Sequence, residues 1–208
     1  MPDDNVIHVV DDDVPFREGL RALLEGAGFS VVEYGDGHSF VEGAAAAVGC
    51  ALIDVNMPDQ SGIALQEELG RRGVKIPVII MTGDADVPMA VRAMKAGAVD
   101  FIEKPIDMAD LRAAIERALT RRDSAEQEDP AVTAIKARIP GLTAREREIL
   151  EAVVGGHPTK IIAHKLGISP RTVHVHRLHI GEKLGVTGLS NLVRLALAAG
   201  VTPLGLPS

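Results

Sequence analysis

The chain has 208 residues, of which 46% are hydrophobic, 25% are charged and only 2% are aromatic, and its net charge is −7. This composition excludes a disordered or fibrous protein and predicts one or two globular domains with cores of Ala, Val, Leu, Ile and Met. The single cysteine excludes an internal disulfide, and no apolar run approaches the ~20 residues of a membrane span, so we expect a cytoplasmic protein without a membrane partner.

The charges divide the chain into two halves. Residues 1–120 hold 10 Lys and Arg against 21 Asp and Glu, whereas residues 141–208 hold 8 against 4. Five of the seven histidines also lie in the last segment. This asymmetry favours two domains and a polyanion ligand for the second one, although chance alone also produces a difference of this size.

Residues 1–120 alternate short apolar runs with amphipathic ones. Five such repeats predict a doubly wound, five-stranded parallel sheet of the α/β class, with helices on both faces. The first helix begins near Pro15, and Leu20, Leu23 and Leu24 are its expected core positions. The expected strands are 6–10, 30–34, 51–54, 77–81 and 99–102, and the other expected helices are 35–47, 62–69, 87–96 and 111–119.

Residues 121–140 are predicted to link the two domains, because the stretch 120–131 has no apolar face. The segment 141–208 is predicted to be an all-α domain of four helices. Thr143 and Glu146 have the spacing of a capping box, and Ser169 with Pro170 is typical of a helix start. The predicted core of this domain contains Leu142, Ile149, Leu150, Ile161, Ile162, Leu166, Val173, Ile180 and Leu184.

Polar residues collect where the predicted strands end, the edge at which open α/β sheets bind ligands. They are Asp11, Asp12 and Asp13 after the first strand, Asp54 after the third, Thr82 after the fourth and Lys104 after the fifth. Clustered carboxylates require a neutralising cation such as Mg²⁺, and a lysine and a hydroxyl can hold phosphate oxygens. Singly, each residue suits a helix cap, a turn or a solvated surface, but together they favour phosphoryl transfer.

The stretches HVVDDD, LIDVNMPDQSG, IIMTG and DFIEKP resemble the four signature stretches of receiver domains in two-component response regulators. The longer stretch DVPMAVRAMKAGAVDFIEKP resembles the FixJ branch, and the resemblance covers essentially the whole chain. It implies that Asp54 is the phosphoacceptor and that Thr82 and Lys104 contact the phosphoryl oxygens. It further implies a switch at Phe101 and a cis bond between Lys104 and Pro105.

By the same resemblance, Mg²⁺ is bound by Asp11, Asp12, Asp54 and the backbone carbonyl of Asn56. The resemblance also implies dimerisation on phosphorylation, through a face that includes Val91, Lys95 and Val99. The implied partners are a sensor histidine kinase, double-stranded promoter DNA, a second copy of the chain and RNA polymerase.

The turn at 167–169 joins two helices at the spacing of a helix-turn-helix, whose second helix enters the major groove. The stretches LTAREREIL, KIIAHKLGIS and PRTVHVHR resemble the LuxR/FixJ-type effector domain, with Thr159 where Asn is common. Gly181, inside the second helix, costs about 1 kcal/mol relative to Ala. The expected DNA-binding residues are Lys160, Arg171, Thr172, His174, Val175, Arg177, Leu178 and Lys183.

Two alternatives to a phosphorylation-controlled transcription factor remain open. An Mg²⁺-dependent phosphatase with an aspartyl nucleophile needs an acid two residues after Asp54, but that residue is Asn56, so we expect no enzyme. An orphan regulator that acts without phosphorylation is disfavoured by the intact set of acids, Thr82 and Lys104. Metal binding by the C-terminal histidines is disfavoured because His174 and His176 point in different directions on a helix.

Overall fold

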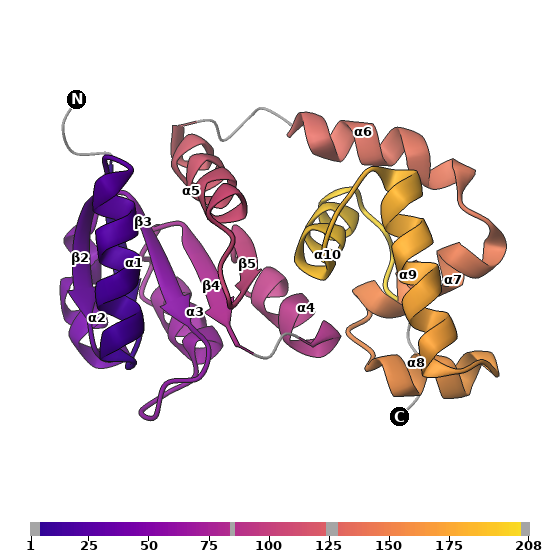
Figure 1. Ribbon diagram of the computed structural model, residues 1–208, viewed down its shortest axis with the longest axis horizontal. Helices are drawn as coiled ribbons and strands as arrows, with labels where there is room; N and C mark the ends of the chain where they lie inside the picture. The colour runs from indigo at the N-terminus through magenta and orange to yellow at the C-terminus, as the bar shows by residue number, and fades with distance from the viewer. Residues whose placement is uncertain (1–4, 84–85, 124–128, 205–208) are drawn as a thin grey trace. The chain divides into compact units, whose positions relative to one another are not determined.

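The computed structural model describes residues 5–83, 86–123 and 129–204, and Figure 1 traces its helices and strands. Contacts divide the described residues into two compact units, 5–83 with 95–123 and 86–94 with 129–204. No helix within the described ranges combines the length and the apolar character that a membrane span requires.

The first unit contains a five-stranded parallel sheet, as the sequence predicts. The spatial order is β2-β1-β3-β4-β5, so the direction of winding reverses between β1 and β3. At such a reversal the carboxyl ends of the two strands border an open crevice. The strands are β1 (Val6–Val10), β2 (Ser30–Tyr34), β3 (Cys50–Asp54), β4 (Val78–Thr82) and β5 (Asp100–Glu103).

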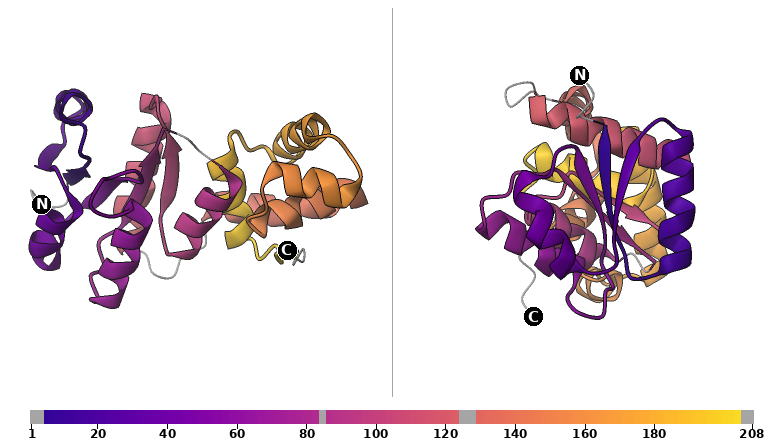
Figure 2. Two further views of the ribbon diagram at one scale, coloured as in Figure 1. Left: turned by 90° about the horizontal axis from the view of Figure 1, so that it is seen from below. Right: turned by 90° about the vertical axis from the view of Figure 1, so that its left-hand side faces the viewer.

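Helices cover both faces of this sheet (Figure 2). The helices that flank the sheet within the first unit are α1 (Val14–Gly26), α2 (Gly37–Gly43) with a 3₁₀ turn at Ala44–Ala46, α3 (Gly62–Arg71) and α5 (Met108–Asp123), whereas α4 (Val87–Lys95) buries Val87 and Val91 in the core of the second unit. Helices α1 and α5 share one hydrophobic core with the sheet, whereas Phe40 of α2 packs on the ring of His8. Leu23, an expected core residue, is 54% exposed, because the buried stripe of α1 runs through Leu20 and Leu24.

The second unit is helical, and one of its helices lies within the segment predicted as a linker. Its helices beyond α4 are α6 (Pro130–Arg138), α7 (Ala144–Val154), α8 (Thr159–Leu166), α9 (Pro170–Leu184) and α10 (Leu189–Ala198), with a 3₁₀ turn at Ile139–Gly141. Val132 and Ile135 of α6 are buried in the same core as Ile149 and Val173, so 130–138 is a packed helix. Residues 124–128 of the predicted linker lie outside the described ranges.

A glycine ends each helix of the helix-turn-helix. Gly167 follows α8 with φ of 64°, and the amide of Ile168 donates to the carbonyl of Ala163. Gly185 follows α9 with φ of 71°, and the amide of Val186 donates to the carbonyl of Gly181. This six-residue bond defines the Schellman ending, which needs a left-handed residue that glycine supplies without strain.

The fold gives Gly181 a reason to be inside a helix. The chain reverses after α9, and a Cβ at Gly181 would lie 2.7 Å from the carbonyl oxygen of Val186. The propensity cost expected from the sequence is therefore offset by a close backbone approach that any larger residue would obstruct.

Glu146, buried at the start of α7, receives three hydrogen bonds from two other residues. Its Oε2 accepts from the Thr143 amide at 2.8 Å, from the Thr143 hydroxyl at 2.9 Å and from Lys183 Nζ at 2.7 Å. The bond from Lys183, followed by that from the Thr143 amide, lowers the pKa of Glu146 to about 2. The capping box predicted from the sequence is confirmed, and α9 is tied to it through Lys183.

Replacing Gly181 by Ala is expected to destabilise the second unit by about 1–3 kcal/mol, because the methyl group displaces the Val186 backbone. The matched control is Gly19→Ala in α1, where a Cβ meets nothing within 4 Å and helix propensity predicts a gain of about 1 kcal/mol. Urea unfolding monitored by circular dichroism measures both changes. A stabilised Gly181→Ala protein would contradict the close-approach argument.

The lowered pKa of Glu146 makes the second unit sensitive to acid. A carboxylate with a depressed pKa stabilises the fold above its unfolded pKa, near 4.5, and this contribution disappears as the pH falls towards 2. Glu146→Gln should therefore lower stability at neutral pH and flatten its dependence between about pH 5 and about pH 2. The control is Glu148→Gln, because Glu148 is exposed and pairs with Arg145 near the surface. This substitution should change the stability little at any pH.

Candidate functional site

Lys104 joins two carboxylates at the carboxyl edge of the sheet. Its Nζ lies 2.7 Å from Oδ2 of Asp11 and 2.7 Å from Oδ1 of Asp54. Asp11 directly follows β1 and Asp54 ends β3, so the crevice between these strands brings the two acids together. Lys104 directly follows β5, and its side chain extends to the two acids. Its backbone amide donates to the Thr82 carbonyl at 2.6 Å.

Burial shifts the pKa values of charged groups in this cluster. Asp11 is 1% exposed and Asp54 is 5% exposed. Burial raises the pKa of Asp11, although hydrogen bonds from Lys104 and from the Asp13 amide act against that shift. Burial by itself lowers the pKa of Lys104, but its bonds to the two carboxylates outweigh burial and the net pKa is raised. Lys104 is therefore held in its charged form by the two carboxyl groups that it contacts.

Three neighbours that sequence reasoning did not single out shape the cluster. Phe16 places its ring centroid 3.8 Å from Lys104 Nζ, and Arg17 donates to the Asp11 carbonyl at 2.6 Å. A Cβ at Gly62 would lie 2.1 Å from the Asp54 carbonyl oxygen, so the chain after β3 returns tightly against it. Their positions in the first turns of α1 and α3, next to the strand ends, are the only sequence signal for them.

The other predicted receiver residues occupy different environments. Thr82 is fully buried at the end of β4, and Phe101 is 2% exposed on β5. Asp12 and Asn56 are exposed, and the Asn56 amide donates to Oδ2 of Asp54 at 2.6 Å. The bond between Lys104 and Pro105 is cis, which confirms the prediction. Asp13 caps α1 through the Phe16 amide.

The predicted magnesium ligands are only partly assembled. Within the described ranges, no group of three or more His, Cys, Asp or Glu side chains has the arrangement of a metal site. Asp11 and Asp54 nevertheless direct one oxygen each to the same cationic nitrogen. Two carboxylates that converge on one cation match the hard oxygen ligands of Mg²⁺, which completes its shell with waters and carbonyls.

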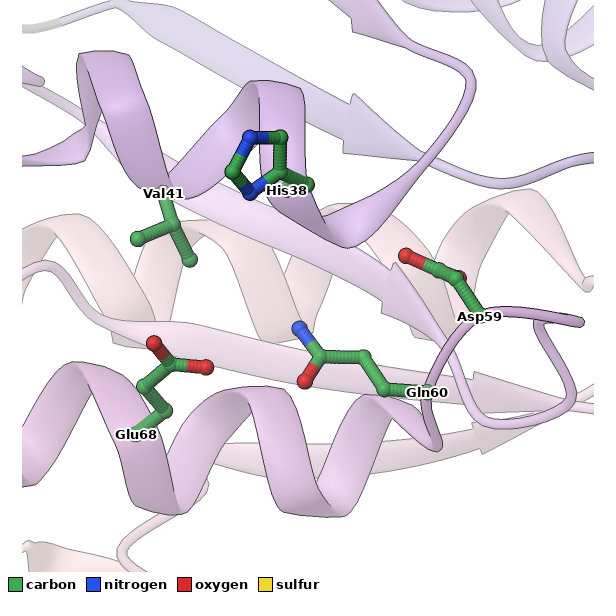
Figure 3. A pocket seen from close by; sticks show the side chains of 5 residues that line it. All are labelled: His38, Val41, Asp59, Gln60 and Glu68. Carbon is green, nitrogen blue, oxygen red and sulfur yellow. The ribbon is translucent and has the colours of Figure 1, made fainter.

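A polar pocket between α2 and α3 shares no lining residue with the Lys104 cluster (Figure 3). His38, Val41, Asp59, Gln60 and Glu68 line it. Asp59 accepts from the Gly37 amide at 3.1 Å, and Glu68 of α3 forms an ion pair with Arg72, the residue that follows this helix. Both acids thus have partners within the first unit.

The outer side of α9 is the candidate DNA-binding surface. Arg171, His174, Val175 and Leu178 are exposed and follow the spacing of one helix face. Lys160 is exposed on α8. Ile161, an expected core residue, is 44% exposed, because α8 buries Ile162 and Ala163 instead.

Three expected DNA-binding residues already have roles within the domain. Thr172 shares a hydrogen bond with Ser169, the cap of α9, and Lys183 donates to Glu146. Arg177 is only partly exposed, and burial lowers the pKa of its guanidinium group. These three side chains therefore contribute to the helical packing, whatever they do on DNA.

Comparisons with known proteins also divide the chain into two domains, although they place residues 86–94 in the first one. Residues 7–116 match the response regulator receiver domain, and residues 140–196 match the bacterial regulatory proteins of the luxR family. The transcriptional regulatory protein FixJ of Azorhizobium caulinodans is 45% identical over 204 residues, which cover 98% of this chain and 97% of that protein. The response regulator protein TmoT of Ectopseudomonas mendocina is 38% identical over 92% of this chain and 88% of its own length.

Solved structures give the same result. Full-length FixJ from B. japonicum is 41% identical with a TM-score of 0.55, covering 94% of this chain and 97% of that one. The structure titled FixJ-N is 45% identical with a TM-score of 0.54, covering 56% of this chain and 94% of that one. The chain therefore belongs to the two-component response regulators, as a transcription regulator with a receiver domain and a LuxR-type DNA-binding domain.

Proposed function

We propose that Asp54 accepts a phosphoryl group from a phosphohistidine of a sensor histidine kinase. The observation that carries the proposal is the Lys104 ammonium group, which lies 2.7 Å from both Asp54 and Asp11. In the reaction, an Asp54 carboxylate oxygen bonds to phosphorus, the phosphorus–nitrogen bond breaks, and the histidine ring recovers a proton. Positioning and charge neutralisation dominate such a transfer, and this cluster supplies both.

Asp11, Asp12, Asp54 and the Asn56 carbonyl would hold Mg²⁺, which neutralises charge on the phosphoryl oxygens when it is bound. Lys104 would then exchange its contact with Asp54 for a contact with a phosphoryl oxygen. Thr82, buried on the adjacent strand end, would donate its hydroxyl proton to another of these oxygens.

The phosphoryl group adds about −1.5 to −2 charge, and it acts through contacts that differ between two states. In our proposal the side chains of Thr82 and Phe101 change conformation together, and this change promotes dimerisation. Of the face expected for the dimer, Lys95 is exposed, whereas Val91 is 2% and Val99 is 6% exposed. Dimerisation through this face therefore requires the two valines to become accessible.

The output is sequence-specific binding to promoter DNA by α9, followed by an effect on RNA polymerase. Residues 1–120 act as the receiver and residues 141–208 as the DNA-binding domain, and α6 in the segment between them adds two buried side chains to the core of the second unit. The exposed side chains of Arg171 and His174 support this role for α9. We assign the chain no enzymatic turnover, since its relatives are named as regulators and Asn56 lacks the acid that a phosphatase needs.

Light scattering tests the receiver mechanism. In Mg²⁺, the phosphoryl mimic beryllofluoride should shift the wild-type chain from monomer to dimer, because it occupies the site beside Asp54 and Lys104. Asp54→Ala should abolish the shift. The control is Glu67→Ala on the exposed side of α3, which should dimerise like the wild type.

If the wild type binds the mimic but does not dimerise, phosphorylation-driven dimerisation is wrong. If it does not bind the mimic at all, phosphorylation itself is excluded. DNA binding that Asp54→Ala leaves unchanged would then identify the chain as an orphan regulator.

Salt titration tests the DNA-binding surface. Lys160→Ala should weaken binding to a mixed-sequence duplex and reduce the slope of log K against log salt by about 1, because one phosphate contact is lost. Lys75→Ala, an exposed lysine of the first unit, should change neither quantity. An unchanged slope in Lys160→Ala would remove Lys160 from the interface.

A further inference from the structure

The exposed side of α9 carries two aliphatic side chains in otherwise polar surroundings. Val175 is 40% exposed and Leu178 is 55% exposed. Within residues 129–204, the only other large hydrophobic side chain that is exposed to this degree is Ile161 of α8. Exposed aliphatic side chains at the centre of a candidate DNA-binding surface need an apolar group on the DNA to contact.

Helix geometry places this pair on the face that would meet DNA. Val175 and Leu178 follow Arg171 by four and seven residues, so the three side chains lie along one stripe. The opposite face of α9 is buried through Val173 and Ile180. The stripe therefore joins a guanidinium group, suited to phosphates or guanine, to an apolar centre.

The major groove offers one apolar group to such a centre. Base-pair edges present donors and acceptors there, and the C5-methyl group of thymine is the exception. Leu178 has no polar atom, so covering a donor or acceptor with it would leave that group unsatisfied, at a free-energy cost. Two side chains flanked by Arg171 and His174 are also too small an apolar area for a protein partner.

We propose that Val175 and Leu178 select thymine by contacting its methyl group in the major groove. This inference rests on the proposed DNA-binding function and specifies what that function reads. Three residues of helix advance by about 4.5 Å, and one base pair advances by about 3.4 Å. The spacing of the two side chains is thus close to that of adjacent base pairs, and we expect the two methyl groups to lie on neighbouring pairs.

The experiment removes single methyl groups from the DNA. Duplexes are selected from a random-sequence pool with the full-length chain in Mg²⁺, with and without beryllofluoride. Affinities are then measured for the selected duplex and for copies in which each thymine is replaced by uracil, which lacks only the methyl group. At two neighbouring positions the wild type should lose about fourfold in affinity, the equivalent of ~0.8 kcal/mol for one buried methyl-sized group.

The variants assign each methyl group to a side chain. Leu178→Ala should bind thymine and uracil equally at one of the two positions, and Val175→Ala should do so at the other. Ile161→Ala removes an equally exposed aliphatic side chain outside the stripe and should keep the wild-type discrimination at both positions.

The remaining outcomes distinguish a failure of methyl recognition from a failure of the proposed DNA-binding function. Selective binding that no uracil replacement weakens would overturn methyl recognition and leave DNA binding intact. Discrimination that persists in both alanine variants would assign the methyl contacts to other residues and also overturn the inference. Failure to select any sequence would overturn specific DNA binding, and methyl recognition with it.

Discussion

A single ammonium group between two buried carboxylates governs the chemistry of the first unit. Asp11 and Asp54 are 1% and 5% exposed, and the Lys104 ammonium group 2.7 Å from each of them offsets the cost of burying the two carboxyl groups. The lysine is held by the backbone bond from its own amide to Thr82 and by the ring of Phe16. Lys104 therefore connects the carboxyl groups of Asp11 and Asp54 to the end of β5.

The first unit could be predicted almost completely because its signals are local and repeated. Apolar runs of strand length recur at regular spacing, and the acids that follow β1 and β3 meet wherever parallel strands end at one edge. Leu23 was predicted wrongly, because helical spacing alone does not fix how wide a buried stripe is. The approach of Phe16 to Lys104 joins residues far apart in the sequence, and no pattern indicates it.

The second unit was predicted less well, for reasons of packing. Helix α6 has two buried residues, Val132 and Ile135, which are too few to give a clear apolar period within a charged stretch. The expectation that Lys183 contacts phosphate follows from its place on α9, but no sequence pattern indicates its bond to Glu146, 37 residues earlier. Gly181 is explained only by the returning backbone at Val186. In each case the deciding partner is distant in sequence.

The glycine endings of α8 and α9 have an evolutionary consequence. They fix the direction of α9 through backbone bonds, and its buried side anchors it to the core. The exposed side chains of α9 contribute little to its direction or its packing, so they can be substituted without unfolding the domain. A lineage of such regulators can therefore acquire new target sequences by exchanging a few surface residues while one scaffold persists.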